Sequence, residues 1–392
     1  MKFMSIPSLK EKYFQWRYWS NLYHDMFNNL ENHHHKTNQE CIPYINKPGV
    51  ALSFDDSYRV HEWYENGKEL FGYYDVKVTF NINGIHPLDG ERKHNQEEID
   101  KLLELQANGH EIGHHGFNHM KATDYSTQHG YHRWIKDEIE LLLNWMNEQT
   151  HSTTKDKFKK PVSFAFPHFQ YDKEHIKKLV PNYFKITRGH LNKDNLTAFN
   201  YEGFAPSICL DGYYSCNVYY LKKIIKLAKE KGENVIFTCH SIIPEEAKME
   251  KLVDGTKADR WARWAVTTKL IQTIINEVRN NDMEFYTTSE LAGIANIMDN
   301  NLESAVRKII AKPIESKWLR ISDLVNIKEL DLSNCCISAL DGIQYFWGLE
   351  KLNLANNNIT DFRLLKKIPF LKEVVLNGNP GYKETLKIAK VN

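Results

Sequence analysis

From Gly49 onward, short apolar runs alternate with longer amphipathic segments along the chain. The short runs are rich in β-branched and aromatic residues and predict strands, whereas the amphipathic segments predict helices. Strands that alternate with helices of this length indicate βα units around a parallel sheet or barrel. The predicted strands include VALSFDD (50–56), VKVTFNIN (76–83), PVSFAFP (161–167) and NVIFTCHSI (234–242), and the predicted helices include 97–109, 220–232 and the long segment 258–281.

The N-terminal segment has a different pattern, because residues 7–31 carry many aromatic side chains at helical spacing. We interpret this segment as a helix that packs on the outside of a domain. His33, His34 and His35 follow in a polar stretch, where an exposed turn is a better interpretation than a metal site.

Beyond residue 300 the apolar pattern repeats with a fixed period. Leu330, Leu352 and Val374 lead three similar segments and are each 22 residues apart. The period and the L-x-L-x-x-N/C pattern predict leucine-rich repeats, each with one short strand. The segment resembles the internalin-type repeats of bacteria, and residues 301–325 match their helical cap. Cys335, Asn357 and Asn379 are expected to bond the turn backbone, and a protein partner is an accessory role that three repeats can serve.

Composition excludes several classes of function. Lys and Arg number 51 against 50 Asp and Glu, so the net charge is +1. The chain therefore lacks the excess of basic residues that is typical of nucleic-acid-binding proteins. No apolar run is long enough for a transmembrane helix, and the first residues lack the apolar core of a signal peptide. We therefore expect a cytoplasmic protein with no membrane span, although a chain trimmed of its leader would look the same.

The cysteines do not predict a thiolate metal site. None of the six forms a C-x-x-C pair, and in a reducing compartment they are expected to be buried free thiols. They are Cys41, Cys209, Cys216, Cys239, Cys335 and Cys336.

Histidines gather in GHEIGHHGFNHM, residues 109–120. His110 to His114 fits H-E-x-x-H, which holds zinc when both histidines share one face of a helix. Gly109, Gly113 and Gly116 interrupt this segment, and glycine disfavours helix interiors, so a protease helix is a weak interpretation. The alternative is a metal-binding loop in which His115 and His119 form the pair.

Carboxylates and a further histidine stand at the ends of other predicted strands. Asp55 and Asp56 end one strand, and barrel active sites lie at the carboxyl ends of strands. Two histidines with one carboxylate leave an open position on zinc, and the same ligands suit cobalt or nickel. His240 ends another strand, where a histidine can act as a general acid.

The order SFDDS, EIGHHGFNHM, FAFPHF and IFTCHSI resembles the NodB-like polysaccharide deacetylases of carbohydrate esterase family 4, over about residues 48–290. The resemblance implies a distorted (β/α) barrel that hydrolyses acetyl groups, N-acetyl first, on a glycan or sugar. It implies Asp56, His115 and His119 as metal ligands, Asp55 as general base and His240 as general acid. It also implies that the backbone after Pro167, at His168, helps to hold the oxyanion, and that Arg188 orients Asp55.

This chain departs from the family pattern at several positions. Ser57 replaces a usual Gly, Met120 replaces Pro, and Ala165 stands where many members have the Arg that pairs with the base. Asp211 is a weak candidate for the group that orients His240. A degenerate carbohydrate binder and a protein-interaction module therefore remain as alternatives to an active deacetylase.

The predicted domains are an N-terminal extension (1–47), a deacetylase-like domain (48–298) and a repeat domain with its cap (299–392). His110 is expected at the surface and His114 in the pocket lining, and neither is expected to bind metal. His86, His168 and His190 are further candidates to reach the pocket. For Trp261 and Trp264, core packing is favoured over stacking on a sugar ring.

Overall fold

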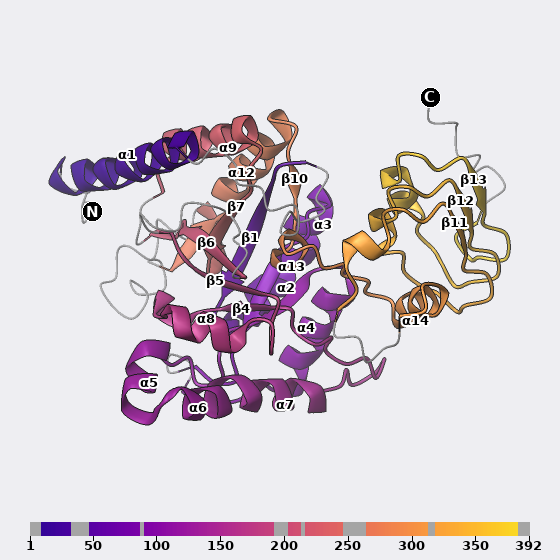
Figure 1. Cartoon of the computed structure of the whole chain (residues 1–392), viewed down its shortest axis with the longest axis horizontal. Coiled ribbons are helices and arrows are strands. Elements are labelled where there is room, and N and C mark those ends of the chain that lie inside the picture. Colours follow the sequence, from indigo (N-terminus) through magenta and orange to yellow (C-terminus); the bar gives the residue numbers. More distant parts are fainter. Residues whose placement is uncertain are drawn as a thin grey trace, which may run out of the picture. The chain divides into compact units, whose positions relative to one another are not determined.

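The structure is a computed structural model that describes residues 9–32, 47–86, 90–191, 203–212, 216–245, 264–312 and 318–382 (Figure 1). The chain divides into two compact units, one of residues 1–105 and 110–292 and one of residues 106–109 and 293–392. His33 to His35, Cys41 and Trp261 lie outside the described residues. Among the described residues, no helix is both long and apolar enough to cross a membrane.

The first unit is a closed parallel barrel. Seven strands pair in chain order, and β1 also pairs with β7, which closes the sheet on itself. A short strand, β10 (Glu284–Phe285), pairs with the beginning of β1. The barrel strands are β1 (Gly49–Asp55), β2 (Thr79–Ile82), β3 (Glu111–His114), β4 (Ser163–Ala165), β5 (Ile186–His190), β6 (Phe204–Cys209) and β7 (Val235–Cys239).

Helices connect the strands on the outside of this barrel, so the fold is a (β/α) barrel, as the sequence predicts. One long helical stretch, residues 131–148, changes from α to π-helical and back to α. Among the described residues of this unit, the α- and π-helices are α1 (Leu9–Asn32), α2 (Val60–Asn66), a π-helix (Gly67–Phe71), α3 (Gly72–Tyr74), α4 (Gln96–Ala107), α5 (Ala122–His129), α6 (Tyr131–Trp134), a π-helix (Ile135–Glu140), α7 (Leu141–Glu148), α8 (Lys173–Leu179), α9 (Val218–Lys231), α12 (Thr268–Asn280) and α13 (Thr288–Leu291).

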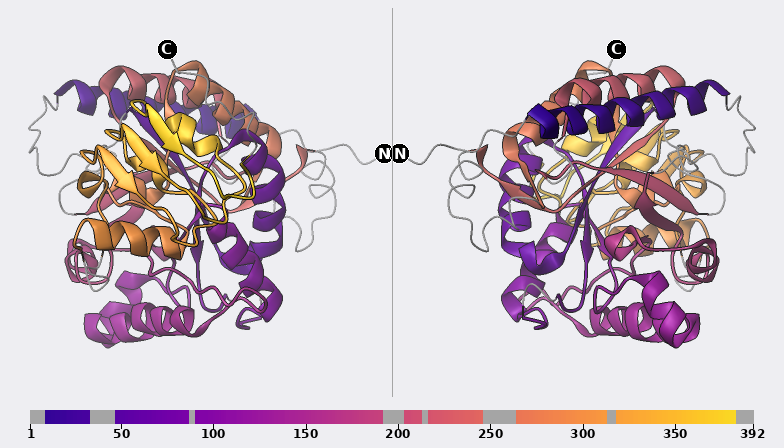
Figure 2. Two further views of the ribbon diagram at one scale, coloured as in Figure 1. Left: turned by 90° about the vertical axis from the view of Figure 1, so that its right-hand side faces the viewer. Right: turned by 90° about the vertical axis from the view of Figure 1, so that its left-hand side faces the viewer.

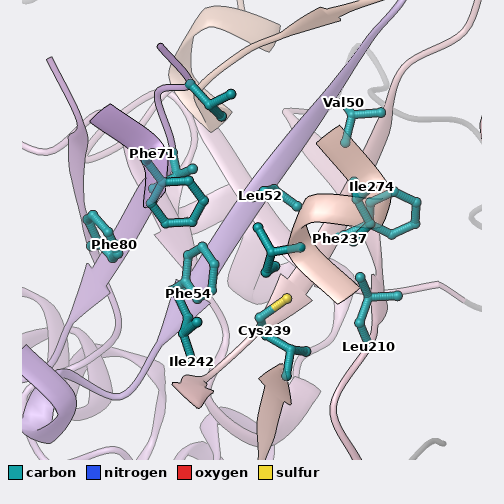
Figure 3. Close-up of a cluster of buried hydrophobic side chains, with 14 of the residues drawn as sticks. Val50, Leu52, Phe54, Phe71, Phe80, Leu210, Phe237, Cys239, Ile242 and Ile274 are labelled. Carbon is teal, nitrogen blue, oxygen red and sulfur yellow. The ribbon is translucent and has the colours of Figure 1, made fainter. Parts of the chain in front are cut away.

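Strand alternation separates an apolar outer layer from a polar interior. Val50, Leu52 and Phe54 of β1 are fully buried in the large apolar cluster that Figure 3 shows. Successive side chains of a strand point to opposite faces, so Ser53 and Asp55 point the other way. The barrel interior near β1 is therefore polar, and it leads to the end of the strand where Asp55 lies.

The aromatic N-terminal helix is α1, and it packs on α9 (Figure 1). The rings of Trp16 and Tyr23 lie 6.4 and 6.1 Å from that of Tyr220 in α9. Trp19 is fully buried, whereas Tyr13 and Phe14 remain about half exposed (53% and 54%). The helix therefore covers the barrel with one face and leaves aromatic rings in solvent on the other.

The helix predicted from residue 258 is wrong in its first half, as far as the structure describes it. Ala265–Thr267 forms a strand, β9, that pairs with β8 (Ser241–Ile243). The helix α12 begins only at Thr268, because the Thr267 side chain accepts a hydrogen bond from the Leu270 N–H and caps it. The β-branched Val266 and Thr267 suit the strand, and a pairing partner distant in sequence decides the conformation.

The second unit contains three short parallel strands with the register that the 22-residue period predicts (Figure 2). Leu330 pairs with Leu352, which pairs with Val374. The buried Asn357 side chain donates to the Leu332 and Leu354 carbonyls, so the predicted bonding of the turn backbone is confirmed there. The strands are β11 (Glu329–Asp331), β12 (Lys351–Asn353) and β13 (Glu373–Val375).

Two further expectations need correction. Among the described residues of the predicted cap (301–312 and 318–325), the helical parts are α14 (Asn300–Ile309) and a 3-10 turn (Ile321–Asp323), and the rest is not helical. The described cysteines are all free, but not all buried, since Cys336 is exposed. Cys336 lies at positive φ (57°) in a repeat turn.

Candidate functional site

The carboxyl ends of the barrel strands bring the candidate residues together. Asp55 is the last residue of β1, and Asp56 follows it in the left-handed region at φ 70°. His115 follows β3, and His240 follows β7. Strand ends in a parallel barrel meet at one face, which explains how segments far apart in the sequence form one site.

Asp56, His115 and His119 form the centre of this site. Asp56 Oδ1 lies 3.0 Å from His119 Nε2 and 3.4 Å from His115 Nε2. All three ligand atoms lie within 4.8 Å of one another. His115 Nδ1 lies 2.8 Å from the Ala165 carbonyl oxygen, which only accepts, so Nδ1 carries the proton and Nε2 is left as a ligand atom.

The donor set fits a divalent cation. Asp56 Oδ1 is buried and accepts no hydrogen bond from the described residues, although two imidazole nitrogens face it. Burial raises the pKa of Asp56, but His119 and His115 outweigh that effect and hold the pKa well below its ordinary value. The other oxygen, Oδ2, accepts from Arg59 Nη1 at 3.2 Å. A buried carboxylate oxygen that lacks a hydrogen bond and is flanked by two histidines is the arrangement in which an ion replaces the missing partner.

Asp55 lies beside this cluster and is held by a buried arginine. Arg188 Nη2 lies 2.7 Å from Asp55 Oδ1 and 2.6 Å from Oδ2, and Asn81 Nδ2 donates to Oδ1 at 2.9 Å. Arg188 Nη1 donates to the hydroxyls of Ser207 and Thr238. Burial raises the pKa of Asp55, but Arg188, His115 and His240 together outweigh burial, so the pKa lies below its ordinary value. Asp55 is therefore ionised at neutral pH.

His240 lies on the other side of Asp56 and is paired with Asp211. His240 Nδ1 donates to Asp211 Oδ2 at 2.5 Å, which leaves Nε2 3.7 Å from Asp56 Oδ2. Burial lowers the pKa of His240, but Asp211 outweighs this and the pKa lies above its ordinary value. The Cys209 thiol also donates to Asp211, and the Trp264 ring lies 5.3 Å from the His240 ring.

Two further histidines, His86 and His168, lie next to the cluster of Asp56, His115 and His119. His86 is buried, its Nε2 lies 3.7 Å from Asp56 Oδ1, and burial lowers its pKa to about 3. His168 is exposed, lies at φ 55° directly after Pro167, and its ring lies 4.5 Å from that of His119. A cleft of about 440 Å³ adjoins His119 and His168, and its lining includes Ile85, Met120 and Tyr125.

The other two histidines of the sequence motif, His110 and His114, are buried in contacts of their own. Glu111 to His114 is strand β3, so the protease helix is excluded. His110 is buried, which corrects its expected surface position, and its Nδ1 accepts from the Val78 N–H. His114 is fully buried against Phe164 and Phe184 rather than lining the cleft. The His190 ring packs against Phe169, at 4.9 Å.

Sequence reasoning missed Glu138, a buried carboxylate behind the loop that carries His119. Its side chain accepts hydrogen bonds from the N–H groups of Asn118 and Met120. Burial raises its pKa to about 7 against the effect of these bonds. A single glutamate within a helical segment gives no motif, so only the fold reveals this contact.

The first unit is thus a closed (β/α) barrel with histidines and carboxylates at the carboxyl ends of its strands. Residues 45–186 match the family model "Polysaccharide deacetylase", and residues 347–385 match "Leucine Rich repeats (2 copies)". The chain thus carries a polysaccharide deacetylase domain in its N-terminal part and leucine-rich repeats in its C-terminal part.

Individual relatives are similar over parts of the chain. Leucine-rich repeat-containing protein 36 of Homo sapiens is 47% identical over 58 residues, which are 14% of this chain and only 8% of that protein. The chitin deacetylase of Colletotrichum lindemuthianum is 18% identical, with a TM-score of 0.37, over 63% of this chain and 89% of that chain. Internalin C2 of Listeria monocytogenes is 32% identical, with a TM-score of 0.21, over 22% of this chain and 38% of that chain.

Proposed function

We propose that the first unit is a metal-dependent hydrolase that removes acetyl groups, N-acetyl in the first place, from a carbohydrate or glycan precursor. The observation that carries this proposal is the cluster of Asp56, His115 and His119 with Asp55 and His240 on either side of it. The polysaccharide deacetylase match of residues 45–186 supports the class of substrate.

Asp56, His115 and His119 would hold the metal, most readily zinc, with cobalt or nickel as alternatives. When bound, such an ion polarises the acetyl carbonyl and makes water easier to deprotonate. The site contributes a ligand set with one carboxylate and two imidazoles, in which the Ala165 carbonyl fixes the tautomer of His115.

Asp55 would act as general base. It is ionised, and Asn81 and Arg188 hold its carboxylate in one orientation beside Asp56. Because Arg188 lowers the proton affinity of Asp55, its role is to position the carboxylate rather than to strengthen it as a base.

His240 would act as general acid. Asp211 accepts from Nδ1 and favours the protonated ring, so Nε2 has a proton to donate to the leaving amine. The backbone after Pro167, at His168, would donate to the oxygen of the acetyl group as negative charge develops there.

Metal content and acetate release, measured together on the full chain, test this proposal. The substrates are a panel of N-acetylated sugars and oligosaccharides, and His119→Ala is compared with Asp55→Asn. We expect one equivalent of zinc in the wild type and in Asp55→Asn, and loss of zinc in His119→Ala. Acetate release should be lost in both variants. Metal without acetate release on any substrate would favour the carbohydrate-binding alternative, and a folded wild type without metal would refute the ligand assignment.

The leucine-rich repeats are proposed to bind a protein partner as an accessory function. The strands expose charged side chains in pairs, such as Lys351 with Glu329 at 3.0 Å. Acetate release from short sugars should therefore be independent of substitutions on this face, such as Lys351→Ala.

A further inference from the structure

The loop between the two histidine ligands is strained at its functional residue. His119 lies in the left-handed region at φ 56°, a conformation that costs a side-chain-bearing residue about 1–3 kcal/mol. Such a residue keeps this conformation only where its surroundings fix it. Residues 116–120 are held in place by contacts from Glu138 and His114.

Glu138 contacts the backbone on both sides of His119. Its Oε1 accepts from the Asn118 backbone N–H at 3.0 Å and from Asn118 Nδ2 at 2.7 Å. Its Oε2 accepts from the Met120 N–H at 3.2 Å. The Glu138 backbone carbonyl in addition accepts from the Phe117 N–H at 3.0 Å. One residue therefore fixes the chain immediately before and immediately after His119.

Gly116 provides the space that this contact needs. A Cβ atom at position 116 would lie 2.6 Å from Glu138 Oε2, and the residue lies at φ 78°, where L-residues are disfavoured. The absence of a side chain at Gly116 therefore leaves room for the Glu138 carboxylate.

The helix that carries Glu138 departs from regular α-helical geometry at this point. Glu138 lies in the π-helical segment Ile135–Glu140, and such segments are frequent at functional sites because they redirect side chains within a helix. His114 supports the same loop, since its Nδ1 accepts from the Gly116 N–H while its Nε2 lies 3.2 Å from the Ile139 carbonyl oxygen.

We propose that Glu138 is a positioning residue that holds the 116–120 loop so that His119 points at the metal. This inference rests on the proposed metal site and extends it by one residue that does not touch the ion. A glutamate that served only to anchor its helix would have no reason to accept bonds from both neighbours of a ligand.

The test is a zinc titration of the full chain against a chromophoric chelator, with the cobalt absorption spectrum as a second readout. In Glu138→Gln, one oxygen that accepts a backbone N–H becomes a donor, so the loop loses a bond on one side of His119. Removal of such supporting contacts weakens metal binding by about 10–100-fold. We expect a loss of that size and an altered cobalt spectrum.

Glu140→Gln is the matched control, because it makes the same chemical change at an exposed position of the same segment. Its zinc affinity should equal that of the wild type. If Glu138→Gln does not fold, Asn118→Ala carries the test, because it removes one bond to Glu138 from a partly exposed residue.

The outcomes separate this inference from the proposed function. A folded Glu138→Gln with wild-type zinc affinity and cobalt spectrum overturns the positioning role and leaves the metal site intact. A wild type that binds neither ion overturns both. A variant that is only less stable, with unchanged affinity in its folded fraction, assigns Glu138 to helix anchoring and also overturns the inference.

Discussion

Replacing Arg188 by methionine tests the buried ion pair with Asp55 most directly. Both side chains are almost inaccessible, with 1% and 2% of each residue exposed, and the pair is joined by contacts of 2.7 and 2.6 Å. Removing one member of such a pair leaves a buried charge without a partner and costs about 3–5 kcal/mol. The hydroxyls of Ser207 and Thr238, which Arg188 also contacts, contribute less to this loss of stability, because Thr238 already donates to Ser207.

The pH dependence of this loss has a defined sign. In the wild type, the pKa of Asp55 is lowered, so the pair contributes stability above the unfolded pKa of about 4 and loses it as the pH falls through the folded pKa. Without Arg188, only His115 and His240 oppose the effect of burial, so we expect the pKa of Asp55 to rise. Asp55 of the folded variant then keeps its proton while Asp55 of the unfolded chain releases it. The loss of stability relative to the wild type therefore grows as the pH rises above about 4.

Urea unfolding of the full chain at pH 5 and pH 8 measures this effect, with the barrel transition followed by tryptophan fluorescence. We expect Arg188→Met to lose about 3–5 kcal/mol at pH 8 and less at pH 5. The double variant with Asp55→Asn should recover much of the loss, because no charge remains to be buried. A deficit below about 1 kcal/mol, or one that is the same at both pH values and unaffected by Asp55→Asn, would refute the reasoning.

Three further predictions concern other parts of the molecule. Asp211→Asn removes the carboxylate that raises the pKa of His240, so the alkaline limb of the pH profile of acetate release should move to lower pH; an unchanged limb would contradict His240 as the acid. Asn357→Ala leaves buried turn groups unpaired and should destabilise the repeat unit by about 2–3 kcal/mol in thermal unfolding, whereas the exposed Asn358→Ala should change it by less than about 0.5 kcal/mol. Dialysis against a chelator should abolish acetate release and zinc should restore it; activity that survives complete metal removal would exclude the proposed mechanism.

The sequence predicts the parts of this protein that repeat or carry motifs. The 22-residue period predicts the exact pairing of Leu330 with Leu352 and Val374, because each repeat places one strand beside the last. Strand-end acids and histidines predict the site, because parallel strands end at one face. The match of residues 45–186 agrees with the family that those motifs indicate.

The remaining features depend on contacts between distant segments. Ala265–Thr267 has a helical pattern around it and becomes a strand because β8 is available to pair with it. His110 is polar and lies in a motif, yet burial among apolar side chains and a bond from Val78 decide its position. Glu138 has no sequence signal at all, since its partners are backbone groups 18 and 20 residues away.

The departure at Ala165 shows how the fold preserves chemistry that a motif lacks. The family pattern often places at this position an arginine that pairs with the base. Here Ala165 of β4 is the direct register partner of Arg188 in β5, so both side chains leave the sheet on the same face. In this chain the arginine stands on β5 instead of β4, and its guanidinium contacts Asp55. The missing motif residue is therefore no argument for an inactive site, because the charge that it supplies is present from the neighbouring strand.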